Sequence, residues 1–126
     1  MNDIAKRLKA LSDPTRLRIV QLLGHGELCV CDVMAALTLP QSRVSRHLAY
    51  LDNSGWVTGV RRGKWVSYRL AEPADPVQAR VLAALRETLP GLPMAREDHA
   101  RLCAHLKTKT AAACAGPDTA KQGDGI

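Results

Sequence analysis

Apolar residues near the start of the chain recur at the spacing of amphipathic helices. Ile4, Leu8 and Leu11 share one face of a first predicted helix. Pro14 marks the early turn of a second helix, where its missing N–H costs nothing. That second helix is apolar around most of its circumference, at Leu17, Ile19, Val20, Leu22 and Leu23. A helix with so small a polar face is predicted to lie centrally in the core.

Two shorter helices joined by a tight connection are predicted next. The first starts near Cys29 and ends near residue 37, and the second covers 41–53. At about 100° per residue, one side of the second helix carries Val44, Leu48 and Leu51. The opposite side carries the basic and hydrogen-bonding residues Ser42, Arg43, Arg46 and Tyr50. The apolar side is expected to face the core and the polar side to be exposed.

A β-hairpin is predicted after these helices. The β-favouring runs 55–60 and 65–70 are joined by Arg61-Arg62-Gly63-Lys64. Gly63 supplies the positive φ that a tight hairpin needs. Three positive charges are therefore expected at the hairpin tip.

Helical spacing returns after the hairpin. A fifth helix is predicted over 73–89, and a further one over 95–107. We expect three regions: a winged helix-turn-helix over 1–89, a helical C-terminal extension over 90–110, and a disordered tail over 111–126, where small and polar residues dominate. The expected fold class is mainly α with a β-hairpin wing.

Composition excludes several classes of protein. The 126 residues are 46% hydrophobic, which is too high for wholesale disorder. No apolar run approaches the roughly 18 residues of a membrane span, and no secretory signal is evident, so we expect a cytoplasmic protein with reduced thiols. The four histidines show no pairing with a nucleophile, and no phosphate-cradling glycine loop is present. We therefore expect no enzyme.

Positive charge is concentrated where the helix-turn-helix and the hairpin are predicted. The chain has 18 Lys+Arg against 12 Asp+Glu, a net charge of +6. Six of the basic residues fall within 43–69, opposed there by Asp52 alone. Such a cluster attracts polyanions, and we expect the partner to be double-stranded DNA.

The two parts of this basic region suit different DNA contacts. On the fourth helix the candidate contacts are Gln41, Ser42, Arg43, Ser45, Arg46 and His47. Arginine there can read guanine and glutamine can read adenine. At the hairpin tip the candidate phosphate contacts are Arg61, Arg62 and Lys64. The alternatives are a set of ordinary solvated charges, or a winged-helix module that binds another protein.

Cys29 and Cys31 form a Cys-x-Cys pair at the start of the third predicted helix. In a regular helix the two side chains would be about 200° apart, but in a non-helical first turn both can face one ion. A helix start favours the thiolate, the form that binds soft ions. Ligation there would distort a helix that packs against the DNA-reading one. The alternative is that both are merely buried small residues.

Three strings of residues resemble the ArsR/SmtB family of metal-responsive repressors, most closely its arsenic-sensing members. They are Glu-Leu-Cys-Val-Cys-Asp at 27–32, Ser-Arg-His-Leu-Ala at 45–49 and Arg-Gly-Lys-Trp-Val-Ser-Tyr-Arg-Leu at 62–70. The resemblance covers roughly 4–89. It implies a homodimer, formed through the first and fifth helices, that binds operator DNA when ligand-free. It further implies that As(III) or Sb(III) on Cys29 and Cys31 releases the DNA, and that no prosthetic group is needed.

One position departs from the family pattern. Where arsenic sensors of this type often carry a third cysteine, this chain has Met34. The third ligand could be Cys103 or Cys114, a small thiol or hydroxide; alternatively, the sensor takes methylated arsenicals that need two sulfurs. Cys103 also shares a helix face with His99, which would suit a separate zinc-like site.

Cadmium/lead sensors of the same family share the cysteine pair but add cysteines from a longer N-terminal arm, where this chain has none. Sensors that bind metal on the fifth helix need His and carboxylate pairs, and 73–89 holds Asp75 and Glu87 without a histidine. Both readings are less favoured alternatives. The residues do not define the operator sequence or the preferred arsenical.

Overall fold

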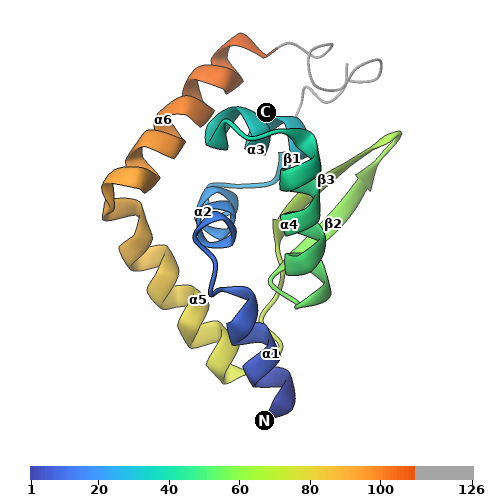
Figure 1. Cartoon of the computed structure of the whole chain (residues 1–126), viewed down its shortest axis with the longest axis vertical. Helices are drawn as coiled ribbons and strands as arrows, with labels where there is room; N and C mark the ends of the chain where they lie inside the picture. Colours follow the sequence, from blue (N-terminus) through green and yellow to red (C-terminus); the bar gives the residue numbers. More distant parts are fainter. Residues whose placement is uncertain (110–126) are drawn as a thin grey trace.

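Helix α2 lies at the centre of the fold, with the other elements arranged around it (Figure 1). The computed structural model describes residues 1–109. In chain order its elements are α1 (Asn2–Ala10), α2 (Pro14–Leu23), β1 (Leu28–Cys29), α3 (Val30–Leu37), α4 (Gln41–Asn53), β2 (Val57–Arg62), β3 (Trp65–Leu70), α5 (Pro76–Thr88), the short 3-10 helix η1 (Leu89–Gly91) and α6 (Pro93–Thr108).

The apolar stripes predicted from the sequence form the core. Ile19, Val20 and Leu22 of α2 are buried, as are the inward residues of α4, Val44, Leu48 and Leu51. The N-terminus of α2 is capped by Asp13, whose carboxylate accepts hydrogen bonds from the amides of Thr15 and Arg16. The prediction that α2 is central is confirmed.

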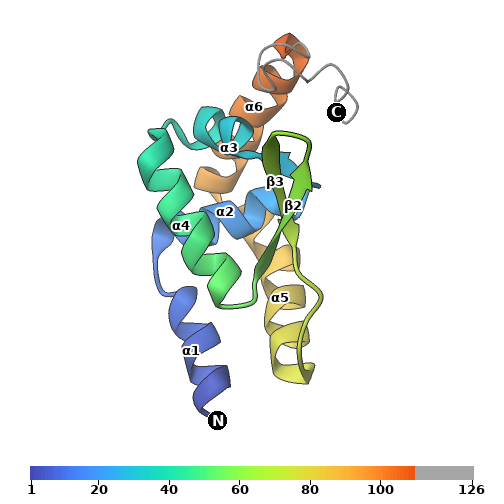
Figure 2. The same cartoon turned by 90° about the vertical axis from the view of Figure 1, so that its right-hand side faces the viewer.

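Helices α3 and α4 pack together as a helix-turn-helix, and β2 and β3 form the predicted hairpin (Figure 2). Gly63 in the turn has φ of 66°, the left-handed conformation that the sequence predicted. The structure adds a third strand: β1 pairs antiparallel with β3, with Cys29 opposite Ser67, so the strand order is β1-β3-β2. The wing sheet therefore includes the first residue of the Cys-x-Cys pair.

Helix α6 packs against α2 and α3, and a buried carboxylate holds it there. Asp98, fully buried, accepts two hydrogen bonds from Arg18 of α2 at 2.9 and 2.8 Å and one from Arg101 at 2.7 Å. Arg101 also donates to the carbonyl of Ala36 at the end of α3, at 2.7 Å. The hydrogen bond to Asp98 raises the pKa of Arg18, although burial opposes the shift.

The boundaries of the later helices differ from those predicted by a few residues. Helix α5 begins at Pro76 rather than 73, because Asp75 caps it by accepting from the amide of Gln78. Helix α6 extends the predicted 95–107 by a residue or two at each end. Within residues 1–109 no helix combines the length and apolarity that crossing a bilayer requires. The tail predicted over 111–126 lies outside the described residues.

Candidate functional site

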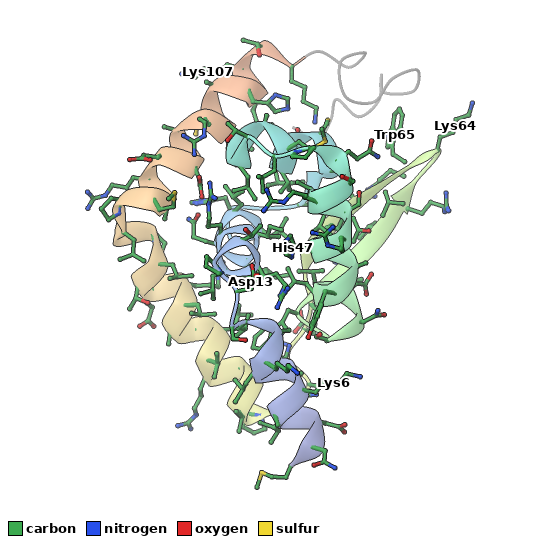
Figure 3. All side chains as sticks on the ribbon, in the orientation of Figure 1. Lys6, Asp13, His47, Lys64, Trp65 and Lys107 are labelled. Carbon is green, nitrogen blue, oxygen red and sulfur yellow. The ribbon has the colours of Figure 1, made fainter. Side chains whose placement is uncertain are left out.

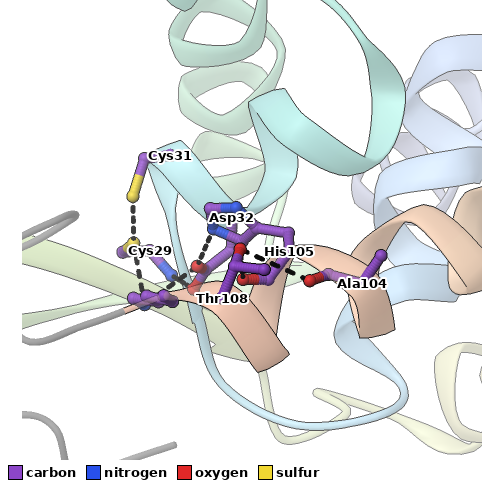
Figure 4. A network of polar contacts seen from close by, with 7 residues as sticks. Cys29, Cys31, Asp32, Ala104, His105 and Thr108 are labelled. Atoms are coloured by element: carbon purple, nitrogen blue, oxygen red, sulfur yellow. Dashed lines mark hydrogen bonds and ion pairs between the residues drawn. The ribbon is translucent and has the colours of Figure 1, made fainter.

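The two cysteines stand on either side of a strand–helix boundary. Cys29 ends β1 and is the N-cap of α3, with an extended backbone at φ −89° and ψ 170°. Cys31 lies in the first turn of α3, and the two Sγ atoms are 3.0 Å apart (Figure 4). Because Cys29 precedes the helical residues, the 200° separation of a regular helix does not apply. The local fold thus brings both sulfurs to one point.

Asp32 closes the turn that carries the cysteines. Its Oδ2 accepts a hydrogen bond from the backbone N–H of Cys29 at 3.0 Å, one half of a capping-box arrangement. The side chain is 1% exposed. A buried carboxylate needs hydrogen-bonding or cationic partners. The sequence predicts that Asp32 suits the first turn of a helix, but it does not identify those partners.

The other oxygen of Asp32 is bound by the end of α6. Oδ1 accepts from His105 Nε2 and from Lys109 Nζ, both at 2.9 Å (Figure 4). Lys109 Nζ also lies 3.8 Å from Cys29 Sγ. The end of α6 thus brings an ammonium group beside the cysteine pair. His105 and Lys109, which lie 73 and 77 positions after Asp32 in the sequence, complete the surroundings of the thiol pair. Sequence reasoning missed both residues.

In the described part of the chain, one group of potential metal ligands gathers three donors: Cys29, Cys31 and Asp32, with ligand atoms within 4.8 Å of one another. Two sulfurs and one carboxylate oxygen suit a soft or borderline ion. Met34, at the position of the missing third cysteine, packs against the hydrophobic core.

Among the described residues, Cys103 is not part of this group. Cys103 Sγ lies 3.4 Å from His99 Nε2, and the His99 ring stacks on His25 with centroids 4.0 Å apart. Burial lowers the pKa of His25, and the neighbouring His99 and Arg86 lower it further. Cys114 lies outside the described residues.

The outer face of α4 presents Gln41, Ser42, Arg43 and Arg46 to solvent, as predicted, and Ser45 is half-buried. His47 is different: it is 9% exposed and turns toward α2, where its Nδ1 lies 3.3 Å from Arg16 Nη1 (Figure 3). Burial lowers the pKa of His47, with the carboxylate of Asp13 opposing that shift and nearby arginines adding to it. His47 therefore lies on the side of α4 that packs against α2, and its contact with DNA stays a prediction.

The wing tip carries Arg61 and Lys64 in exposed positions, with Lys64 projecting away from the molecule (Figure 3). Arg62 is also exposed but makes a bidentate ion pair with Glu27, at 2.9 Å from Nε and 2.8 Å from Nη2. Arg62 stays a candidate phosphate contact, and in this structure the Glu27 carboxylate holds its guanidinium. The outer face of α4 and the hairpin lie on the same side of the molecule (Figures 1 and 2).

Comparison with known proteins places these features in context. Residues 13–58 match the family described as "Bacterial regulatory protein, arsR family". The arsenical resistance operon repressor of Escherichia coli is 48% identical over 75 residues, which are 59% of this chain and 64% of that protein. A helix-turn-helix transcriptional regulator of Methanocaldococcus jannaschii is 39% identical over 69 residues, covering 54% of this chain and 78% of its own length.

Among solved structures, the homodimeric winged helix-turn-helix DNA-binding domain of a possible ArsR-family regulator from Mycobacterium bovis superposes with a TM-score of 0.59. It shares 29% identity and covers 72% of this chain and 82% of its own. The match to the Escherichia coli repressor spans slightly less than two thirds of that protein. The family match thus covers α2, α3 and α4, and the structural similarity covers 72% of the chain.

Proposed function

The chain belongs to the arsR family of bacterial transcriptional regulators, and from that premise we propose that it is a homodimeric repressor whose inducer is As(III) or Sb(III). The protein binds operator DNA when ligand-free and dissociates when the metalloid binds Cys29 and Cys31. The observation that carries this proposal is the 3.0 Å separation of the two Sγ atoms at the β1–α3 boundary. Paired thiolates are ligands for soft, thiophilic ions.

The position of the thiols supports a link between inducer and DNA. Cys29 is paired with β3 of the wing, and Cys31 belongs to α3, which packs against α4. An ion bound to both sulfurs joins the wing sheet to the helix-turn-helix at one point. If the ion binds more tightly to the DNA-released arrangement, it weakens the binding of DNA by some factor. Bound DNA must then weaken the binding of the ion by that same factor.

The DNA contacts divide between two elements in this proposal. Gln41, Ser42, Arg43 and Arg46 on the exposed face of α4 enter the major groove and read base edges, with Ser45 beside them. Arg61 and Lys64 at the wing tip contact phosphates. In a twofold-symmetric dimer the two copies of α4 meet half-sites about 34 Å apart.

Exposed apolar side chains on α1 and α5 support dimerisation through these helices. Leu8 of α1 is 41% exposed and Val77 of α5 is 42% exposed, and the two helices contact one another. An ion pair between Arg7 and Asp75 holds α1 at the start of α5. Burying such side chains against a second copy would add apolar area that this small fold leaves in water.

The third arsenic ligand is assigned to Cys114 in this proposal. Cys103 is turned toward His99, whereas the end of α6 reaches the thiol pair through Lys109. Cys114 follows Lys109 by five residues, a length that spans up to about 17 Å when extended.

X-ray absorption of the As(III) complex tests this assignment. We expect a shell of three sulfurs in the wild type and in Cys103→Ser, which serves as the matched control. Cys114→Ser is expected to retain two sulfurs, with a lighter atom in the third position. Three sulfurs in Cys114→Ser and two in Cys103→Ser would reverse the assignment.

Cd(II) is the second candidate inducer, because the carboxylate of Asp32 stands beside the thiols as an oxygen donor. Fluorescence anisotropy of labelled promoter DNA, under phosphine reductant that spares the metalloid, tests both candidates. We expect arsenite to release the DNA and weaken its binding by a factor between about 5 and 150. Release of the DNA by Cd(II) but not by arsenite would show that Cd(II) is the inducer and As(III) is not. Failure to bind promoter DNA at all would favour a protein-interaction module instead.

A further inference from the structure

The ion pair between Glu27 and Arg62 connects the sensing segment to the wing. Both carboxylate oxygens of Glu27 accept from the guanidinium, at 2.8 and 2.9 Å. The hydrogen bond from Arg62 lowers the pKa of Glu27 against the opposing effect of burial, and Ser67 and Arg69 of β3 contribute in the same direction. Glu27 is therefore held as an anion on the wing sheet.

The two residues lie at informative places in the fold. Glu27 immediately precedes β1, two residues before Cys29, and Arg62 ends β2 at the wing tip. Because β3 lies between β1 and β2, the ion pair reaches across the sheet and links its two outer strands. A single residue, Leu28, separates Glu27 from Cys29 in the chain.

The two N–H donors of Arg62 that bind Glu27 are also the donors that would bind a DNA phosphate. A bidentate contact to a phosphate uses two parallel N–H donors, as the contact to Glu27 does. A phosphate at this place must therefore displace the Glu27 carboxylate, whose negative charge also repels it. In the present structure the carboxylate occupies Nε and Nη2.

We propose that Glu27 is a coupling residue that competes with the operator backbone for Arg62. An inducer bound at Cys29 holds the start of β1, and with it Glu27, in the position that retains Arg62. DNA binding requires Arg62 to be given up to phosphate, so inducer and DNA oppose one another through this ion pair. This inference rests on the proposed function, both for DNA binding by the wing and for an inducer at Cys29.

The test compares Glu27→Gln with Glu72→Gln, an equal change of charge at an exposed residue after β3. We expect Glu27→Gln to tighten binding of both operator and random-sequence DNA, and its advantage over the wild type should grow about 3.5-fold for each wing when the salt concentration is lowered fourfold, because each wing gains one phosphate contact. The slope of log K against log salt should steepen by about 0.9 for each wing. The arsenite concentration for half-release should rise, while Glu72→Gln resembles the wild type in every measurement.

A double-mutant cycle separates competition for Arg62 from a general charge effect. In the Arg62→Gln background, adding Glu27→Gln should change neither the affinity nor the salt slope. Equal tightening by Glu27→Gln with and without Arg62, or equal behaviour of Glu27→Gln and Glu72→Gln, would overturn the inference. If arsenite fails to release the wild type, the proposed inducer is wrong, and the salt slopes still decide whether Glu27 restrains Arg62.

Discussion

Cys29→Ser and Cys31→Ser are each expected to abolish release of DNA by arsenite while leaving operator affinity within about twofold of the wild type. Serine removes the thiolate but keeps the size of the side chain. At position 29 it is also a favourable N-cap residue, so α3 retains its start. The hydrogen bond from the Cys29 amide to Asp32 uses the backbone and survives the substitution. Anisotropy titrations with and without arsenite measure both quantities.

Cys103→Ser is the matched control for these variants, because Cys103 lies near His99 and away from the thiol pair. It should be released by arsenite as the wild type is. If both Cys29→Ser and Cys31→Ser lose operator binding while any remaining complex still responds to arsenite, the cysteines maintain the fold and the inducer binds elsewhere.

Asp98→Ala is expected to lower the free energy of unfolding by about 3 kcal/mol. The substitution leaves the guanidinium groups of Arg18 and Arg101 without their buried carboxylate. Both arginines are partly exposed and can recover some hydration, which places the effect at the lower end for a broken buried ion pair. Because these bonds hold α6 against α2, the loss should appear in global unfolding.

Thermal unfolding at one fixed protein concentration measures this effect. A loss of 3 kcal/mol corresponds to a fall in Tm of roughly 12 °C for a domain of this size. Glu97→Gln, at the neighbouring exposed position of α6, provides the control and should leave Tm nearly unchanged. A Tm for Asp98→Ala within a few degrees of the wild type would show that α6 is held by its apolar contacts alone.

Features set by local periodicity could be predicted from the sequence. The spacing of Val44, Leu48 and Leu51 predicted which side of α4 faces the core, and all three are buried. Gly63 predicted the conformation of the hairpin turn. The Cys-x-Cys string predicted a soft-ion site, because the required chemistry lies within three consecutive residues. Each of these inferences depends on neighbours in the chain, whose relative positions secondary structure alone determines.

Tertiary packing decided which polar groups meet. The sequence marked Asp32 as suitable for a helix start, but its contacts with His105 and Lys109 exist only because α6 docks beside α3. Likewise, the packing of α2 placed His47 beside Arg16, and the pairing of β1 with β3 brought Glu27 within reach of Arg62. No periodic pattern specifies such partners, because long charged side chains can pair with any opposite charge that the fold brings near. The sequence by itself thus determined the helices, the wing and the thiol pair, whereas the docking of distant elements decided what surrounds them.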